Sequence, residues 1–81
     1  MLQKLKTAAN KTVGMKQTIK AVQSGSAEVV FLARDVDDHL ASRITEACKT
    51  AGVEIILVDS MAELGEACGI QVGASTAAIV K

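Results

Sequence analysis

The chain has 81 residues, of which 49% are hydrophobic and 22% charged, with nine basic and nine acidic side chains. A chain of this length buries roughly 60% of the surface that it exposes when unfolded, so we expect a single domain over residues 1–81 with a surface site rather than an enclosed active-site cavity. The composition excludes a disordered chain, and the absence of an apolar run of about 18 residues or of a signal-peptide core predicts a cytoplasmic protein with no membrane partner.

The first predicted element is an amphipathic helix over residues 2–10, where leucines and alanines recur at helical spacing between lysines. A very short strand at 12–13 follows it. A second helix is predicted over residues 15–23, with Gly25 as a C-terminal cap. The β-branched, almost continuously apolar run at 28–33 then predicts a strand that is buried on both faces of a sheet.

A group of turn and N-cap residues, RDVDDH at 34–39, precedes a third helix, which we expect to end near Gly52. The next apolar run, VEIILV at 53–58, predicts a second buried strand. Ser60 is followed three residues later by Glu63, which fits a capping box. In this arrangement each side chain accepts a backbone N–H at the start of a helix, so we expect a fourth helix here.

The end of the chain comprises a helix end at Gly69, the loop GIQVGAS at 69–75 and the strand TAAIV at 76–80. Helices that alternate with nearly continuously apolar strands favour the α/β class. We therefore predict a three-layer α-β-α sandwich around a central mixed sheet of about four strands.

Few residues suggest catalysis or metal binding. His39 lies beside Asp37 and Asp38 at a predicted helix start, where the acids can cap the backbone and match the helix dipole; a weak cation site is the alternative. Cys48 and Cys68 have neither metal-ligand spacing nor the number expected of a disulfide framework, which indicates buried, unreactive thiols. We expect a protein without metal, cofactor or enzymatic activity, and an enzyme of unfamiliar class stays open as an alternative.

The net charge of zero hides an uneven distribution along the chain. Residues 1–27 contain five lysines and no acid, whereas residues 28–81 contain four basic and nine acidic side chains. A chain of this kind can present a cationic face to an anionic partner while its acidic remainder limits nonspecific binding. Lysines placed only where helices meet solvent would give the same distribution, so charge alone does not separate the two interpretations.

The segment GMKQTIKAVQSG, residues 14–25, joins a predicted helix start to basic and amide side chains. A helix N-terminus presents free N–H groups and a partial positive charge, to which Lys16 and Lys20 would add two charges on one face. The Gln17 amide can donate and accept, as reading a base edge requires. Phe31 is the one aromatic residue, so RNA binding would use backbone donors, lysines and aliphatic contacts instead of stacking on rings. An ordinary solvated helix start is the alternative.

Three stretches together resemble the successive signatures of the kink-turn RNA-binding ribosomal-protein superfamily, the L7Ae-like proteins. They are GMKQTIKAVQSG at 14–25, VVFLARDVD at 29–37 and MAELGEACGIQVGAS at 61–75. The likeness covers nearly the whole chain and is closest to the small bacterial YbxF-type branch, whose members share the Lys-Gln pair. It implies a monomeric ribosomal or ribosome-associated protein whose partner is structured RNA with a kink-turn, ribosomal RNA being one candidate.

The resemblance also implies a set of binding residues. In this family the glycine-led helix start contacts guanines of tandem sheared G·A pairs and nearby phosphates, and the loop after the fourth helix packs aliphatic groups on a protruding nucleotide. Gly14 would allow close backbone approach, Lys16 and Gln17 would contact guanine edges, and Lys20 would contact a base or a phosphate. The implied site residues are Gly14, Met15, Lys16, Gln17, Lys20, Ile70, Gln71, Val72 and Gly73.

The sequence departs from archaeal and eukaryotic members of this superfamily at two points. Those members usually have Asn-Glu where this chain has Lys16-Gln17, and a small or hydroxylated residue where it has Met15. A glutamate accepts two guanine donors as an anion, whereas the neutral glutamine offers one carbonyl.

The alternative function is a protein-interaction module that docks through the loop Ile70 to Ser75, with the lysines serving only solubility.

Overall fold

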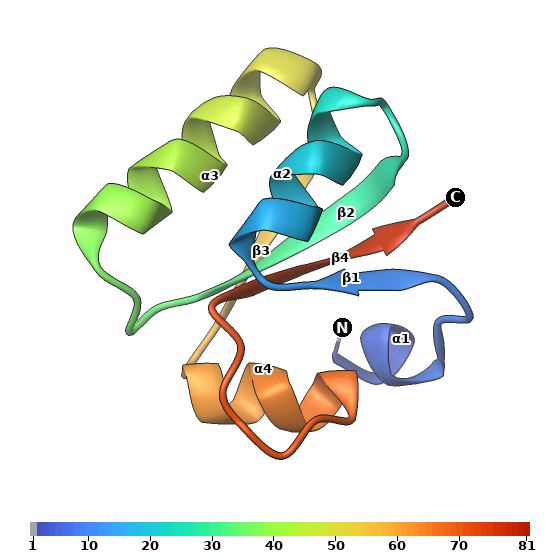
Figure 1. Ribbon diagram of the computed structural model, residues 1–81, viewed down its shortest axis with the longest axis vertical. Coiled ribbons are helices and arrows are strands. Elements are labelled where there is room, and N and C mark those ends of the chain that lie inside the picture. The colour runs from blue at the N-terminus through green and yellow to red at the C-terminus, as the bar shows by residue number, and fades with distance from the viewer. Residues whose placement is uncertain (1) are drawn as a thin grey trace.

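The structure is a computed structural model and describes residues 2–81 (Figure 1). In chain order its elements are α1 (Leu2–Thr7), β1 (Lys11–Val13), α2 (Met15–Gln23), β2 (Ala27–Ala33), α3 (Asp38–Ala51), β3 (Glu54–Val58), α4 (Met61–Cys68) and β4 (Thr76–Val80). Every predicted helix and strand is present, and the strand bounds differ from the predicted ones by at most one residue.

The first helix ends at Thr7 and not at residue 10 as predicted. The Thr7 hydroxyl donates to the carbonyl groups of Gln3 and Lys4, at 3.2 and 3.3 Å, and the Ala8 N–H turns back to the Leu5 carbonyl at 3.3 Å. This tighter turn ends the helix. Ala8 still packs against the core from the turn, which is why apolar residues continue at helical spacing past the helix end.

The four strands form one mixed sheet in the order β1-β4-β2-β3. β4 is antiparallel to both of its neighbours, whereas β2 and β3 are parallel. In this register Phe31 of β2 lies between Ala77 of β4 and Ile56 of β3. The sheet confirms the predicted mixed architecture.

Helices cover both faces of the sheet and complete the predicted three-layer sandwich (Figure 1). On one face α1 and α4 pack in a core that includes Phe31 and Leu64, and on the other α2 and α3 pack in a core that includes Val30 and Ile44. Successive side chains of a strand point to opposite faces, so neighbouring residues of β2 enter different cores. β2 is therefore buried on both faces, as its sequence predicted.

The prediction that residues 53–58 form an equally buried strand is wrong. β3 pairs with β2 alone and forms an edge of the sheet, and Leu57 is 50% exposed. An edge strand lacks a neighbour on one side, so an apolar sequence does not by itself ensure burial. Val58, at the end of this strand, is buried.

The expected N-terminal caps are present at both α3 and α4, but only one of the two hydrogen bonds of the capping box at α4 is formed. The Asp37 carboxylate accepts from the Leu40 N–H at 2.9 Å, and the Ser60 hydroxyl accepts from the Glu63 N–H at 3.1 Å. Among the hydrogen bonds of residues 2–81, the return bond from the Ser60 N–H to the Glu63 carboxylate does not occur. The capping box is thus only half formed.

Candidate nucleic-acid interface

The strand directions bring the starts of α2, α3 and α4 to one end of the sheet (Figure 1). β1, β2 and β3 each end there and are followed by one of these helices, whereas the antiparallel β4 begins there. The loop at 69–75 runs back along α4 and reaches the same end just before β4. The predicted site segments 14–20 and 70–73, far apart in the sequence, thus converge through the topology of the sheet.

Backbone hydrogen bonds fix the start of α2 to the end of this loop. The Gly14 N–H donates to the Thr76 carbonyl at 2.8 Å, and the Ala33 N–H donates to the Ser75 carbonyl at 3.0 Å. The buried Thr76 hydroxyl donates to the Phe31 carbonyl at 2.6 Å. The start of α2 and the end of the 69–75 loop are therefore both held by the strands of the sheet.

The N-terminus of α2 has no side-chain cap. Gly14 holds the N-cap position with φ 93° and ψ 161°, a conformation that is essentially restricted to glycine. No other part of the described protein lies within 4 Å of where its Cβ would be, so the conformation and not crowding requires glycine here. Because the first turn contains no acid, its N–H groups and partial positive charge stay available to an anion or to an acceptor atom of a base.

The other two helix starts at this end are already satisfied by the protein. Asp37 caps α3, which also has Asp38 in its first turn. Ser60 caps α4, and the Asp35 carboxylate accepts from the Met61 N–H at 2.8 Å. The cap confirms the structural role predicted for Asp37. Residues 2–81 contain no group of three or more His, Cys, Asp or Glu side chains that could hold a metal ion.

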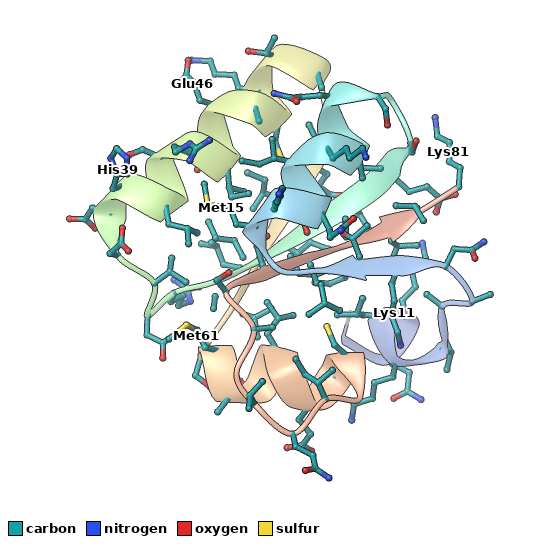
Figure 2. All side chains as sticks on the ribbon, viewed as in Figure 1. Lys11, Met15, His39, Glu46, Met61 and Lys81 are labelled. Atoms are coloured by element: carbon teal, nitrogen blue, oxygen red, sulfur yellow. The ribbon has the colours of Figure 1, made fainter. Side chains whose placement is uncertain are left out.

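Three of the five predicted site residues at the start of α2 face solvent. Lys16, Gln17 and Lys20 are exposed, whereas Met15 is half-buried and packs toward α3 (Figure 2). Lys16 and Lys20 line one surface hollow of about 440 Å³. Its lining consists of Met15, Lys16, Ile19, Lys20, Gln23 and Arg43.

The loop 69–75 packs its backbone on α4 and turns its larger side chains outward. Val72 is 71% exposed and Ile70 is 36% exposed, with Gln71 and Gly73 also exposed. A Cβ on Gly65 of α4 would overlap the Val72 carbonyl oxygen, so this glycine allows the close approach. Gly73 lies near the start of α4, beside Met61, whereas Ile70 lies near its end; the loop therefore presents a strip of aliphatic surface along α4.

The five lysines of residues 1–27 do not form one surface. Lys4 and Lys6 lie on α1, which covers the face of the sheet opposite to α2, and the ammonium group of Lys11 donates to the Leu5 carbonyl at 3.5 Å. Within residues 2–81 the one ion pair joins Arg34 and Asp59 at 3.7 Å. The lysines of α2 are thus left as free cations beside the uncapped helix start.

Arg43 and Gln23 are residues of this surface that the sequence analysis missed. Arg43 belongs to α3 and reaches the hollow beside the α2 lysines because the two helices pack side by side. Its exposed position on a polar helix face looks like that of any solvated arginine in the sequence. Only the packing of α2 against α3 reveals its place.

None of the helices in this described part of the chain is long and apolar enough to cross a membrane.

Comparisons with known proteins agree with this architecture. The model of the ribosomal protein L7Ae/L30e/S12e/Gadd45 family matches residues 1–81. An RNA-binding protein of Caldanaerobacter subterraneus subsp. tengcongensis is 47% identical over 70 residues, covering 86% of this chain and 85% of that protein. RNA-binding protein YbxF of Geobacillus stearothermophilus is 42% identical over 79 residues, covering 98% of this chain and 96% of that protein. The solved structure of the Giardia lamblia 15.5kD RNA binding protein has a TM-score of 0.88 at 30% identity, covering 99% of this chain and 70% of its own.

Proposed function

The chain belongs to the ribosomal protein L7Ae/L30e/S12e/Gadd45 family, and from this premise we propose that it is a non-enzymatic protein that recognises kink-turn RNA. The observation that carries the proposal is the uncapped start of α2, flanked by the free lysines Lys16 and Lys20, at the end of the sheet that the aliphatic 69–75 loop also reaches. Its relatives of similar length are named RNA-binding proteins. Ribosomal RNA is one candidate target.

The start of α2 supplies the polar contacts. Backbone N–H groups there can donate to phosphate or base acceptors, and Gly14 leaves space at its Cβ position for the RNA to approach the backbone. Lys16 and Gln17 are assigned to guanine edges of the sheared G·A pairs, and Lys20 to a base or a phosphate. The glutamine amide suits a base edge because it both donates and accepts.

The 69–75 loop supplies an apolar contact. Ile70 and Val72 expose aliphatic side chains against which a protruding nucleotide can pack. Phe31, the one Phe, Tyr or Trp residue of the chain, is fully buried, so the surface has no ring of these three types on which a base could stack. The binding must therefore depend on the shape of the RNA together with backbone and aliphatic contacts.

A site of this kind favours the kinked form of an RNA that interconverts between extended and kinked forms. The protein shifts that population by its difference in affinity for the two forms. Adding protein should bring the two helical arms of the RNA together. Replacing the sheared G·A pairs with Watson–Crick pairs should leave only the weaker, nonspecific attraction of the phosphates.

Energy transfer between dyes on the two RNA arms tests the proposal. The parent protein should close the arms of the kinked RNA and not those of its Watson–Crick counterpart. Lys20→Ala should weaken binding by about 1 to 3 kcal/mol, and Gln17→Ala should narrow the difference between the two RNAs. Lys4→Ala is the matched control, because it removes a charge from α1 on the other face of the sheet.

Two outcomes would contradict the proposal. Equal binding of both RNAs by the parent protein would refute kink-turn recognition. Absence of RNA binding by the parent protein would instead favour the alternative of a protein-interaction module that docks through the loop Ile70 to Ser75.

A further inference from the structure

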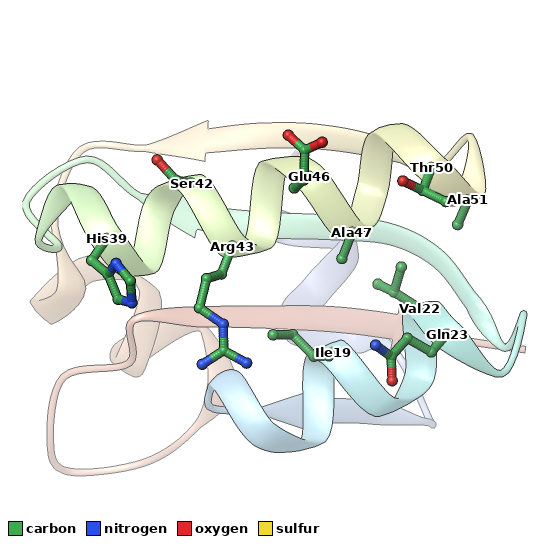
Figure 3. A pocket seen from close by; sticks show the side chains of 10 residues that line it. All are labelled: Ile19, Val22, Gln23, His39, Ser42, Arg43, Glu46, Ala47, Thr50 and Ala51. Carbon is green, nitrogen blue, oxygen red and sulfur yellow. The ribbon is translucent and has the colours of Figure 1, made fainter.

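Two neighbouring surface hollows follow the seam between α2 and α3. The first, of about 440 Å³, lies at the start of α2, and the second, of about 730 Å³, continues between the two helices (Figure 3). Ile19, Gln23 and Arg43 line both hollows. Arg43 therefore lies where the predicted binding surface at the start of α2 passes into the groove between the helices.

The hollow at the start of α2 is strongly cationic. Lys16, Lys20 and Arg43 line it, and its lining contains no acid. The ion pair of residues 2–81, between Arg34 and Asp59, leaves all three of these cations without an acidic partner. Glu46, one turn further along α3, points away from α2, whereas the Arg43 side chain extends toward α2 on the side of Ile19 (Figure 3). Three like charges around one hollow favour an anionic ligand.

The chemistry of the three side chains suits a phosphate group. A guanidinium donates two parallel N–H bonds to a phosphate, and ammonium groups add charge without a fixed geometry. The half-buried Met15 and Ile19 form an apolar floor on which a sugar can rest. Lys16, in the first turn of α2, also lines the hollow, so one RNA can reach both.

We propose that this hollow binds a backbone phosphate of the RNA arm that leaves the start of α2, and that Arg43 is the residue of α3 that holds it. The inference rests on the proposed function and extends the interface from α2 to a second helix. A phosphate contact contributes affinity and orientation but does not read sequence. Arg43 thus serves to position the arm, and α2 reads the bases.

Salt titration of the Arg43→Gln variant tests the proposal with the kinked RNA. We expect roughly tenfold weaker binding. Affinity should also depend less steeply on salt: the magnitude of the slope of log affinity against log salt should be smaller by about 0.7 to 0.9, because one counterion fewer is released. Lys49→Gln is the matched control, since Lys49 is an exposed cation in the last turn of the same helix and lines neither hollow. It should change neither the affinity nor the slope appreciably.

RNAs with one arm shortened locate the contact. Shortening one particular arm should remove the difference between the parent and Arg43→Gln, and shortening the other should preserve it. Equal salt slopes for the parent and Arg43→Gln, with Lys20→Ala still impaired, would overturn the Arg43 assignment and leave the proposed function intact. A parent protein that does not discriminate kinked from straight RNA would instead overturn the proposed function itself.

Discussion

The hydroxyl groups of Thr12 and Thr18 lie 2.9 Å apart and connect β1 to the second turn of α2. Thr18 is fully buried, and its N–H donates to the Gly14 carbonyl at 3.1 Å. The pair therefore holds the first turns of α2 against the sheet edge from which the helix starts. Because this contact fixes the orientation of α2, it also fixes the direction in which the exposed lysines and glutamine of the candidate site point.

Thr18→Val should destabilise the protein by about 1 to 2 kcal/mol, because it keeps the side-chain shape but leaves the Thr12 hydroxyl without its partner. Urea unfolding measures the change. The double variant Thr12→Val/Thr18→Val should cost less than the sum of the two single variants, since both polar groups are then removed. Additive costs would show that the hydroxyl pair does not contribute to stability.

Gly14→Ala should lower the free energy of unfolding by about 1 to 3 kcal/mol through backbone strain, because no protein neighbour would clash with the new methyl group. The control is Gly52→Asn. Gly52 has φ 71° and ψ 31°, the left-handed helical region that asparagine tolerates, so this change should cost clearly less. Equal losses in thermal unfolding would mean that the ψ of 161° at Gly14 carries no special strain.

Gly65→Ala should destabilise the protein, although the same change in an ordinary helix interior stabilises by roughly 0.5 to 1 kcal/mol. The added methyl group would overlap the Val72 carbonyl, so the 69–75 loop or α4 must move at a cost of about 1 to 3 kcal/mol. Glu66→Ala, at an exposed neighbouring position, should stay within about 0.5 kcal/mol of the parent. A more stable Gly65→Ala protein in urea unfolding would contradict this account.

Stability should fall as the pH rises above about 8.5, where the thiols of an unfolded chain ionise. Burial raises the pKa of both Cys48 and Cys68, and Lys11 partly offsets this effect on the pKa of Cys68. A raised pKa in the folded state means that the unfolded chain loses protons first, so the stabilisation is complete below the unfolded pKa and is lost as the pH rises through the folded one. The limiting slope is about 1.4 kcal/mol per pH unit for each thiol.

Denaturant unfolding of Cys48→Ala and Cys68→Ala at several alkaline pH values measures this dependence. Each variant will also lose core packing, so the quantity to compare is the slope of stability against pH. The slope should decrease in both Cys48→Ala and Cys68→Ala, because each variant removes one thiol whose pKa burial raises. A double variant with the slope of the parent protein would assign the alkaline loss of stability to other groups.

Local signals in the sequence predicted most of the fold. Asp37 and Ser60 mark the starts of α3 and α4 because their side chains can accept a backbone N–H within the first turn, and Gly69 marks a helix end because it accepts a positive φ. The order of strands has no local signal. Nothing in the apolar run at 53–58 distinguishes an edge strand from a central one, and that is why the exposure of Leu57 was not predicted.

The candidate site likewise has one part that the sequence could indicate and another that only the fold reveals. The segments that contain Gly14 and Val72 could be selected from the sequence through their resemblance to a family, and their role in binding stays a prediction. Their convergence depends on β4 lying between β1 and β2, which the sequence alone does not specify. Arg43 joins the surface only through the contact between α2 and α3, because its position on a polar helix face carries no distinguishing pattern.

The candidate interface lies at the end of the sheet where three helices start, so the protein should be attached to a solid support from the opposite end. Lys81, whose N–H donates to the Ser26 carbonyl at 2.9 Å, follows the other end of β4, away from Thr76 and the start of α2. Coupling the chain to a sensor surface through Lys81 would point the candidate interface outward. Coupling through Lys16 or Lys20 would bury it against the support, so random attachment through lysine amines would underestimate the amount of active protein.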